Sequence, residues 1–365
     1  MKSVAIFISN DFVHDQRMRR IANAFADLSW RVHVYAVLKK NSLPLEEGMV
    51  PCTRLRILPE NGKRFYTRMN WRFFIKALAA KSDFLMAVDV DTLPGLRLVS
   101  FLKSKPLIWD CHEIFTEMPE LYQRPGIKKV WSIVEKFFGR NLSHVITTTR
   151  GVADHLMSAL GIQAKVIHNY PISYPLESKL DERFKSKILL FQGILNDGRC
   201  LPELIYAIKL LPVEYSLVIA GDGHMRATLE KIIHSENLGD RIKITGMLTR
   251  EELIRLTVTA CIGISLLNKE HQNSFVSLAN KNLDYIMAGL PCVTVNLPEY
   301  AGINQKWKVA TLLEEVNIHT IANAVIQLSG DFQKYRIMHL ACLEARNYLN
   351  WESEVKKLYE FIRSL

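Results

Sequence analysis

The fold is indicated most clearly by residues 188–223, ILLFQGILNDGRCLPELIYAIKLLPVEYSLVIAGDG. The apolar run 188–192 predicts a buried strand, 201–211 has apolar residues at helical spacing, and 216–220 predicts a second strand. Each predicted strand is followed directly by a glycine. A strand, a helix and another strand in this order predict a βαβ unit of a parallel sheet.

The same alternation extends over most of the chain. Before this stretch, strands are predicted at 4–9, 32–37, 84–88, 107–109, 145–149 and 165–168, and a first helix at 18–28. After it follow a helix at 225–236, strands at 242–244 and 261–267, and a helix that begins near Ser277 and ends at Met287. We therefore predict an α/β protein with two Rossmann-like domains.

Length and composition agree with two globular domains. The chain has 365 residues, more than one hydrophobic core usually supports, and is 48% hydrophobic and 23% charged. The prolines between 170 and 175 and the polar stretch that follows predict a linker. The predicted boundaries are 1–172 for the first domain, 173–187 for the linker, 188–346 for the second domain and 347–365 for a C-terminal segment that contains the amphipathic helix 351–365.

Three features predict a cytoplasmic protein. The six cysteines show no C-x-x-C spacing, which argues against a zinc ribbon or a dithiol redox site. The apolar run at 4–8 is shorter than the core of a signal peptide. No segment approaches the roughly 18 continuous apolar residues that a membrane-spanning helix needs.

The positive charge is concentrated in the first half of the chain. Residues 1–180 contain 26 lysines and arginines against 16 acids, whereas residues 181–365 contain 21 of each. The net charge of +10 therefore predicts an anionic partner for the first half.

Four loops after predicted strands carry candidate ligand-binding residues, because ligands bind beyond the carboxyl ends of strands in open parallel sheets. Glycine allows close backbone approach, arginine and lysine bind phosphate, and a helix N-terminus attracts anions. Each residue is also compatible with a purely structural role. The candidates are Gly193 and Arg199; Gly221, Asp222 and Gly223; Ser277, Asn280, Lys281 and Asp284; and His112.

In combination, these residues resemble the GT-B glycosyltransferases of the retaining family-4 type found in cell-surface polysaccharide synthesis. The resemblance extends over nearly the whole chain and rests on the shared order of the motifs. They are Asp15-Gln16-Arg17-Met18, Asp110-x-His112-Glu113, Glu135, His168-Asn169, Gly193 with Arg199, Gly221-Asp222-Gly223, Gly246, Asn280-Lys281 with Asp284, and Ala288-Gly289-Leu290-Pro291.

The resemblance implies two Rossmann-like domains that face each other across a cleft, with the C-terminal helix packed back on the first domain. It implies that His112 lies against the donor sugar, Arg199 clamps the donor diphosphate and Asp284 binds the ribose. Asn10, Asp15, Arg17 and Glu113 are the candidates for binding the acceptor. Two positions depart from the family, because Val276 stands where the first acid of its paired acids is expected and Ile194 replaces its usual arginine.

The resemblance further implies transfer from a nucleotide diphosphate sugar with retention of configuration, without a cofactor or an essential metal. Negative charge develops on the departing diphosphate, so Arg199, Lys281 and a helix N-terminus are expected to stabilise the transition state. No nucleophile with an adjacent base is evident, and the leaving phosphate is expected to deprotonate the acceptor.

The segment 62–76 suggests how the acceptor is reached. It interleaves lysines and arginines with aromatic residues and contains no acid. Such segments favour the surface of anionic membranes, so we predict a peripheral contact that brings a lipid-linked acceptor to the enzyme. The alternative is that Phe65, Trp71 and Phe74 pack on the first sheet while the basic residues face water.

Four other functions are compatible with parts of the sequence. Asp89-Val90-Asp91 would suit a metal-dependent transferase of another fold, but that fold lacks a second Rossmann-like domain. A nucleotide-sugar epimerase shares the expected architecture, and a non-enzymatic nucleic-acid or anion-binding protein would explain the basic half; we expect no nucleic-acid partner because no such motif is present. An NAD oxidoreductase is disfavoured because the turn 9–12 lacks G-x-G-x-x-G.

Overall fold

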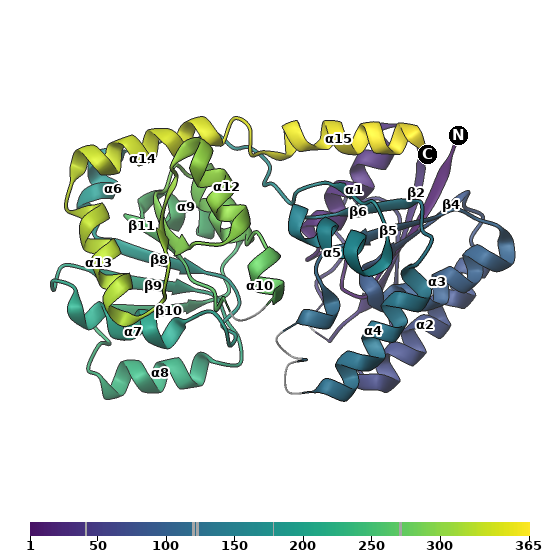
Figure 1. Cartoon of the computed structure of the whole chain (residues 1–365), viewed down its shortest axis with the longest axis horizontal. Helices are drawn as coiled ribbons and strands as arrows, with labels where there is room; N and C mark the ends of the chain where they lie inside the picture. Colours follow the sequence, from purple (N-terminus) through teal and green to yellow (C-terminus); the bar gives the residue numbers. More distant parts are fainter. Residues whose placement is uncertain (41, 119–120, 122–123, 178, 270–271) are drawn as a thin grey trace. The chain divides into compact units, whose positions relative to one another are not determined.

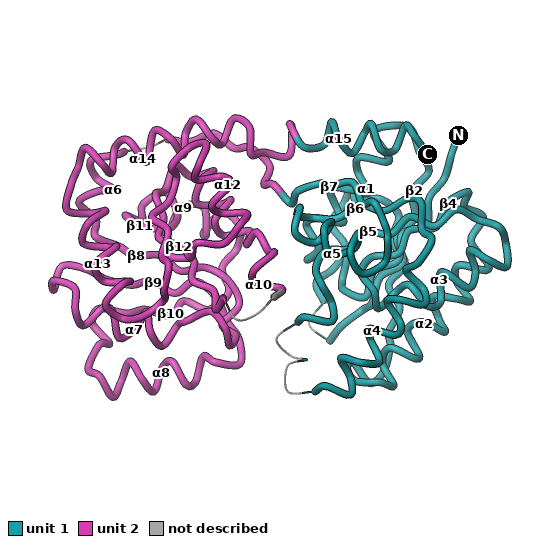
Figure 2. The backbone as a smooth tube through the Cα atoms, in the orientation of Figure 1, with its two compact units in different colours: residues 1–169, 354–365 teal, residues 170–353 magenta. Residues whose placement is uncertain are grey.

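The computed structural model describes residues 1–40, 42–118, 121, 124–177, 179–269 and 272–365. The chain forms two compact units (Figure 2). Unit 1 consists of Met1–Asn169 and Glu354–Leu365, and unit 2 of Tyr170–Ser353.

Unit 1 contains a seven-stranded parallel sheet in the order β3-β2-β1-β4-β5-β6-β7. The central strands are buried over their whole length, which explains their continuous apolar sequences. The strands are β1 (Ser3–Ile8), β2 (Arg31–Leu38), β3 (Cys52–Arg56), β4 (Phe84–Val88), β5 (Leu107–Cys111), β6 (His144–Thr147) and β7 (Lys165–Val166).

Helices cover both faces of this sheet. Figure 1 shows α2, α3 and α4 gathered on one face and α1 on the other. Side chains start two of the helices, since Asp15 accepts a hydrogen bond from Met18 N and Thr149 accepts one from Val152 N. The helices are α1 (Gln16–Asp27), α2 (Gly62–Ala79), α3 (Asp89–Lys103), the short η1 (Phe115–Glu117), α4 (Pro125–Gly139) and α5 (Arg150–Leu160).

Unit 2 contains a six-stranded parallel sheet in the order β10-β9-β8-β11-β12-β13. Its strands are β8 (Ile188–Gln192), β9 (Ser216–Ala220), β10 (Ile242–Gly246), β11 (Ile262–Ser265), β12 (Cys292–Val295) and β13 (Ala310–Leu313). Its helices are α6 (Leu180–Ser186), α7 (Leu201–Leu210), α8 (Arg226–Ser235), α9 (Arg250–Thr259), α10 (Gln272–Val276), α11 (Asn280–Met287), α12 (Pro298–Trp307), α13 (Ile318–Ser329) and α14 (Phe332–Ala345). The two parallel sheets confirm the predicted fold class of two Rossmann-like α/β domains.

The last helix, α15 (Trp351–Ser364), contributes its residues from Glu354 onward to unit 1. The buried Glu354 accepts a hydrogen bond from His168 N at 2.9 Å, and Tyr359 donates one to Asp27 at 2.9 Å. The end of the chain therefore packs against the first domain, as the resemblance implied.

The expected linker 173–187 is wrong in its second half. Leu180–Ser186 form α6, and Arg183 on this helix is buried. Its guanidinium donates to the carbonyls of Val258, Ala288 and Gly289, so the segment is part of unit 2. The charged residues of this stretch had suggested a solvated linker, but the three carbonyl groups bind the guanidinium of Arg183 inside unit 2. Ser178 lies outside the described residues.

The C-terminal boundary also differs from the expected one, because unit 2 continues to Ser353 instead of ending at residue 346. Trp351 N donates to Pro171 O at 2.8 Å, which holds the start of α15 in unit 2. Among the described residues, no helix combines the length and hydrophobicity needed to cross a membrane.

Candidate functional site

Two glycine-containing loops pack together at the carboxyl ends of β8 and β9. A Cβ atom on Gly221 would lie 1.9 Å from Gly193 O, and one on Gly223 would lie 2.5 Å from Leu195 O. Leu195 N also donates to Asp222 O at 3.0 Å. Gly221 and Gly223 are thus required for contact between the loops, whereas the sequence had suggested contact with a ligand. Gly193 has φ +125°, a conformation that favours glycine.

We expect Gly221→Ala to lower the free energy of unfolding by about 1–3 kcal/mol, because the new methyl group collides with a backbone oxygen that cannot move alone. Urea unfolding followed by circular dichroism measures the change. Gly302→Ala is the matched control, because Gly302 lies within α12 and a Cβ atom added there would meet no atom within 4 Å. That variant should be stabilised by up to about 1 kcal/mol. Equal stability of Gly221→Ala and wild type would contradict the packing argument.

Two cations lie beside these loops. Lys281, in the first turn of α11, is 8% exposed, and its Nζ lies 3.6 Å from the Phe191 ring centroid and 3.6 Å from the Cβ position of Gly193. Burial, and then the charge of Arg199, hold the pKa of Lys281 well below its usual range. Within the described parts of the chain, neither cation forms an ion pair with a carboxylate. The pair is therefore a local excess of positive charge that an anionic ligand would neutralise.

Asp284 lies one turn further along α11 and is half-buried. Its Oδ2 accepts a hydrogen bond of 2.8 Å from Gln192 Nε2, at the end of β8. Gln192 is itself held, because its Oε1 accepts a hydrogen bond of 3.3 Å from Thr257 Oγ1. The structure thus brings Asp284, Lys281 and Gly193 to the same end of β8.

Three other donor-site candidates lie at this edge with different partners. Asn280 is exposed and is the first residue of α11, which begins there and not near Ser277 as predicted. Ser277 lies in the turn before the helix, where its hydroxyl donates to Ser274 O at 3.1 Å. Asp222 is exposed, and its carboxylate accepts hydrogen bonds from Gly223 N at 2.8 Å and Arg226 Nη1 at 3.3 Å.

In unit 1, His112 lies at the carboxyl end of β5 between two carboxylates. Its Nε2 is 2.9 Å from Asp110 Oδ2, its Nδ1 is 3.5 Å from Asp89 Oδ2, and its backbone N–H donates to Asp89 Oδ1 at 2.8 Å. The fully buried Asp110 also accepts hydrogen bonds from Arg17 at 2.7 and 3.1 Å. Arg17 in turn donates to Ile167 O at 2.7 Å.

The charges of this network stabilise one another. Burial opposes the charged form of Asp110, but Arg17 and His112 outweigh it and hold the pKa of the carboxyl well below its usual range. Burial likewise opposes the charged form of His112, but Asp89 and Asp110 raise its pKa to about 9. His112 is therefore an imidazolium at neutral pH, with both ring N–H groups facing carboxylates.

Asp91 is buried in the first turn of α3. Burial, reinforced by the neighbouring charge of Asp89, raises its pKa to about 7. In the part of the chain that the structure describes, no group of three or more His, Cys, Asp or Glu is placed to hold a metal ion.

The four candidate acceptor residues have separate surroundings. Arg17 is 4% exposed, and its described hydrogen bonds go to Asp110 and Ile167, so it holds the network in position. Its role in binding the acceptor stays a prediction. Asp15 is the N-cap of α1. Asn10 is exposed and accepts a hydrogen bond of 2.7 Å from Lys39 Nζ, and Glu113 is half-buried after β5.

Sequence reasoning missed several partners of these residues. The sequence suggested Asp89 only as a metal ligand, although it follows β4 and β4 pairs with β5, so that adjacent strand ends bring it to His112. Gln192 and Phe191 were predicted only as parts of a strand. Asp89, Gln192 and Phe191 all lie at the ends of strands, and this position could have identified them, because the carboxyl ends of parallel strands bring side chains to one edge of the sheet.

Two family models account for most of the chain. A model of the group 1 glycosyl transferases matches residues 176–339, which lie in unit 2, and a model of glycosyltransferase family 4 matches residues 16–170, which lie almost entirely in unit 1. Both models therefore describe glycosyltransferase domains, in the order that the sequence predicted.

Similarity to individual proteins is more distant. Chitobiosyldiphosphodolichol beta-mannosyltransferase from Candida albicans is 20% identical over 98% of this chain and 88% of its own length. Sucrose-phosphate synthase from Thermosynechococcus elongatus has a TM-score of 0.81 at 16% identity, covering 100% of this chain and 99% of that one.

HepE from Anabaena, solved with UDP and glucose, has a TM-score of 0.79 at 16% identity and covers 100% of both chains. Identities this low show a shared fold, and the family models add the activity. The chain is therefore a glycosyltransferase with the GT-B fold, of the family-4 type.

Proposed function

We propose that the protein transfers a sugar from a nucleotide diphosphate sugar, held by unit 2, to a glycan or lipid-linked acceptor that binds unit 1. The observation that carries this proposal is the pair Arg199 and Lys281, two neighbouring cations without a carboxylate partner among the described residues. A diphosphate supplies the negative charge that this pair lacks. The complex of HepE with UDP and glucose supports a nucleotide donor.

The donor would lie across the end of β8. Gly193 is exposed and carries no side chain, so a ligand can approach its backbone next to Lys281 Nζ. Asp284 remains the proposed partner of the ribose hydroxyls, with Gln192 holding its carboxylate in place at 2.8 Å. Asn280 is proposed to contribute at the N-terminus of α11, whose dipole favours an anion.

In the proposed reaction, the bond between the anomeric carbon and the diphosphate oxygen breaks and a glycosidic bond forms to the acceptor oxygen. The acceptor proton passes to the leaving diphosphate, and configuration is retained without an essential metal. Arg199 and Lys281 stabilise the charge that develops on the diphosphate. His112 acts as a fixed imidazolium and not as a base, because both its ring nitrogens face carboxylates.

We further propose a role in surface polysaccharide or glycolipid synthesis in the cytoplasm, with a peripheral contact of α2 at the inner face of the membrane. Of the three aromatic residues that the structural alternative placed on the sheet, Phe65 is buried and Phe74 is half-buried, but Trp71 is 63% exposed. The basic residues of the helix, Lys63, Arg64, Arg68, Arg72 and Lys76, are all exposed. An exposed tryptophan among cations is suited to the lipid headgroup region.

The donor proposal is tested by thermal unfolding with UDP, GDP, dTDP, CDP and NAD, on wild type and Asp284→Ala. We expect one nucleoside diphosphate to raise the melting temperature of wild type, since a ligand at about 100 times its Kd stabilises by about 2.7 kcal/mol. The variant should lose that shift. A shift with NAD and none with any diphosphate would overturn the proposal. Product formation that requires an acceptor separates transfer from epimerisation.

A further inference from the structure

Tyr300, in the first turn of α12, lies beside the start of α11 in unit 2. Its side chain is 3% exposed, and its ring belongs to the apolar core of this unit. Its hydroxyl oxygen accepts a hydrogen bond of 2.9 Å from Ala279 N, the backbone N–H of the residue before α11. The phenol is therefore held at both ends, by the packing of its ring and by the backbone at the helix start.

The start of α11 has no side-chain cap. Its N-cap residue is Ala279, whose methyl group cannot accept a hydrogen bond. Tyr300 binds the N–H group of Ala279 and does not replace that cap, because a cap accepts from the N–H groups of the next turn. An uncapped helix start attracts an anion, and Tyr300 fixes where this start lies.

The hydroxyl of Tyr300 has a hydrogen to donate, and no described residue accepts it. A phenol can accept and donate at once, and the bond from Ala279 uses only the oxygen. Burial raises the pKa of Tyr300 to about 12, so the hydroxyl keeps its proton at neutral pH. Because a buried tyrosine hydroxyl usually has a partner, this donor indicates that a ligand completes its hydrogen bonding.

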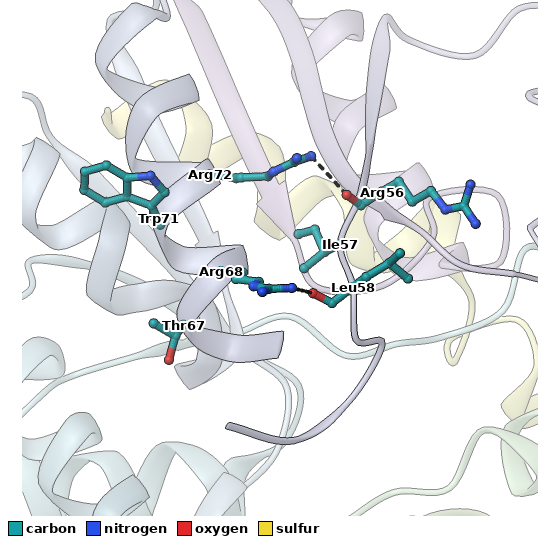
Figure 3. A pocket seen from close by; sticks show the side chains of 7 residues that line it. All are labelled: Arg56, Ile57, Leu58, Thr67, Arg68, Trp71 and Arg72. Atoms are coloured by element: carbon teal, nitrogen blue, oxygen red, sulfur yellow. Dashed lines mark hydrogen bonds between the residues drawn. The ribbon is translucent and has the colours of Figure 1, made fainter. Parts of the chain in front are cut away.

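Arg199 lies near this hydroxyl, and its charge favours the ionised phenol, which partly offsets the effect of burial on the pKa of Tyr300. The guanidinium of Arg199 is half-buried and donates to no residue that the structure describes. Arg72 in unit 1 shows the contrast, because it lines a pocket of about 710 Å³ and donates to Arg56 O at 3.0 Å (Figure 3). Arg199, unlike Arg72, has all five of its N–H donors left for a ligand.

Lys281 completes a group of three donors at the start of α11. Its ammonium lies near Arg199, whose charge adds to burial in lowering the pKa of the lysine. Within the described chain, the hydroxyl of Tyr300, the guanidinium of Arg199 and the ammonium of Lys281 have no hydrogen-bond acceptor. A phosphate group offers oxygens that accept from all three. The two cations alone would attract any anion, whereas the hydroxyl adds a directed bond.

The order of residues along α11 indicates which phosphate lies nearest Tyr300. Asp284, the proposed partner of the ribose, follows Ala279 by five positions, which is about 7.5 Å along a helix axis. Lys281 lies between them. A donor whose ribose binds Asp284 therefore directs its α-phosphate toward Lys281 and its β-phosphate toward Ala279 and Tyr300.

We propose that Tyr300 is a ligand of the β-phosphate of the nucleotide diphosphate sugar, to which its hydroxyl donates a hydrogen bond. The same hydroxyl continues to accept from Ala279 N, so it links the phosphate to the start of α11. During transfer the β-phosphate carries the oxygen that leaves the sugar, and the bond gains strength as negative charge develops there. This inference rests on the proposed donor site and adds a residue to it.

The test is Tyr300→Phe, which removes the hydroxyl and keeps the ring. Calorimetric titrations compare UDP, GDP, dTDP and CDP with the matching nucleoside monophosphates, on wild type and on the variant. For the diphosphate that wild type binds most tightly, we expect Tyr300→Phe to bind about tenfold more weakly, because a hydrogen bond to a charged group is lost. Affinity for the matching monophosphate, which lacks the β-phosphate, should stay the same.

Tyr215→Phe is the matched control. Tyr215 is 5% exposed, its hydroxyl lies 2.8 Å from Ser329 Oγ, and it precedes β9, at the opposite end of the sheet from the donor residues. This variant should bind both nucleotides as wild type does. Two results with Tyr300→Phe would overturn the inference. Unchanged affinity for the diphosphate would show that no bond is lost, and equal weakening with both nucleotides would show that Tyr300 only supports α11.

A second measurement keeps the hydroxyl and guards against misfolding of the phenylalanine variant. With 3-fluorotyrosine incorporated at position 300, the fluorine NMR signal should move on addition of the diphosphate and stay in place with the monophosphate. An equal response to both nucleotides would contradict a bond to the β-phosphate.

Failure of this inference and failure of the donor site give different results. If none of the four diphosphates binds wild type, the donor site is refuted and the role of Tyr300 falls with it. If a diphosphate binds wild type and Tyr300→Phe equally well, the donor site remains and only the bond from Tyr300 is removed.

Discussion

Lys281→Met is expected to lower kcat/KM for transfer by about 100-fold to 1000-fold while making the unliganded protein more stable. The loss of activity follows because the ammonium is proposed to stabilise charge on the departing diphosphate. The gain in stability follows because Lys281 is a buried cation beside Phe191 and near Arg199, without a carboxylate partner among the described residues. Replacing such a charge with an apolar side chain is expected to stabilise the fold by about 1–3 kcal/mol.

Opposite changes in activity and stability distinguish this role from a structural one. Lys231→Met, at an exposed position on α8, is the control and should alter neither quantity appreciably. Steady-state kinetics and urea unfolding supply the two measurements. If Lys281→Met were destabilised, or if it retained full activity, the anion-binding role of Lys281 would be refuted.

The pH dependence of the free energy of unfolding provides a further test of Lys281, again by comparison with Lys281→Met. The pKa of Lys281 is lower in the folded chain than in the unfolded chain, so the unfolded chain binds more protons between the two values. The free energy of unfolding of the wild-type protein should therefore gain from Lys281 as the pH rises, and this gain should be complete at about pH 10.5. The difference between wild type and Lys281→Met should shrink over the same range.

Asp110→Asn is expected to lower the free energy of unfolding by about 3–5 kcal/mol. Asp110 is fully buried, and its replacement leaves the guanidinium of Arg17 buried without its carboxylate. The variant also removes the partner of His112 Nε2, so the pKa of His112 should fall from its value of about 9. Chemical unfolding measures the first effect, and NMR titration of the imidazole measures the second.

His112→Gln isolates the contribution of the histidine. Because the folded pKa of His112 is raised, its contribution to stability is complete below about pH 6.5 and is lost as the pH rises through about 9. Wild type and His112→Gln should therefore differ most at neutral and acidic pH and converge in alkali. A stability difference that does not change with pH would show that folding leaves the pKa of His112 unshifted, and would refute its stabilisation by Asp89 and Asp110.

Hydrophobic periodicity by itself determined much of the architecture. The strands 84–88, 188–192 and 216–220 were predicted with the bounds they have in the structure, because a buried parallel strand is apolar along its whole length. Helix ends were less certain: the start of α11 lies at Asn280, since the segment from Ser277 forms a turn closed by Ser274 O. Local pattern indicates a helix better than it locates the first residue.

The sequence determined the order of two Rossmann-like domains, the family and the set of polar residues at strand ends, because these properties are local or follow from motif order. Only the tertiary structure decided what those residues contact. Gly221 is required by the backbone of Gly193, and Arg17 is bound to Asp110, 93 positions away. Such contacts depend on how strands far apart in sequence pair and how their loops pack, and periodicity carries no information about that pairing.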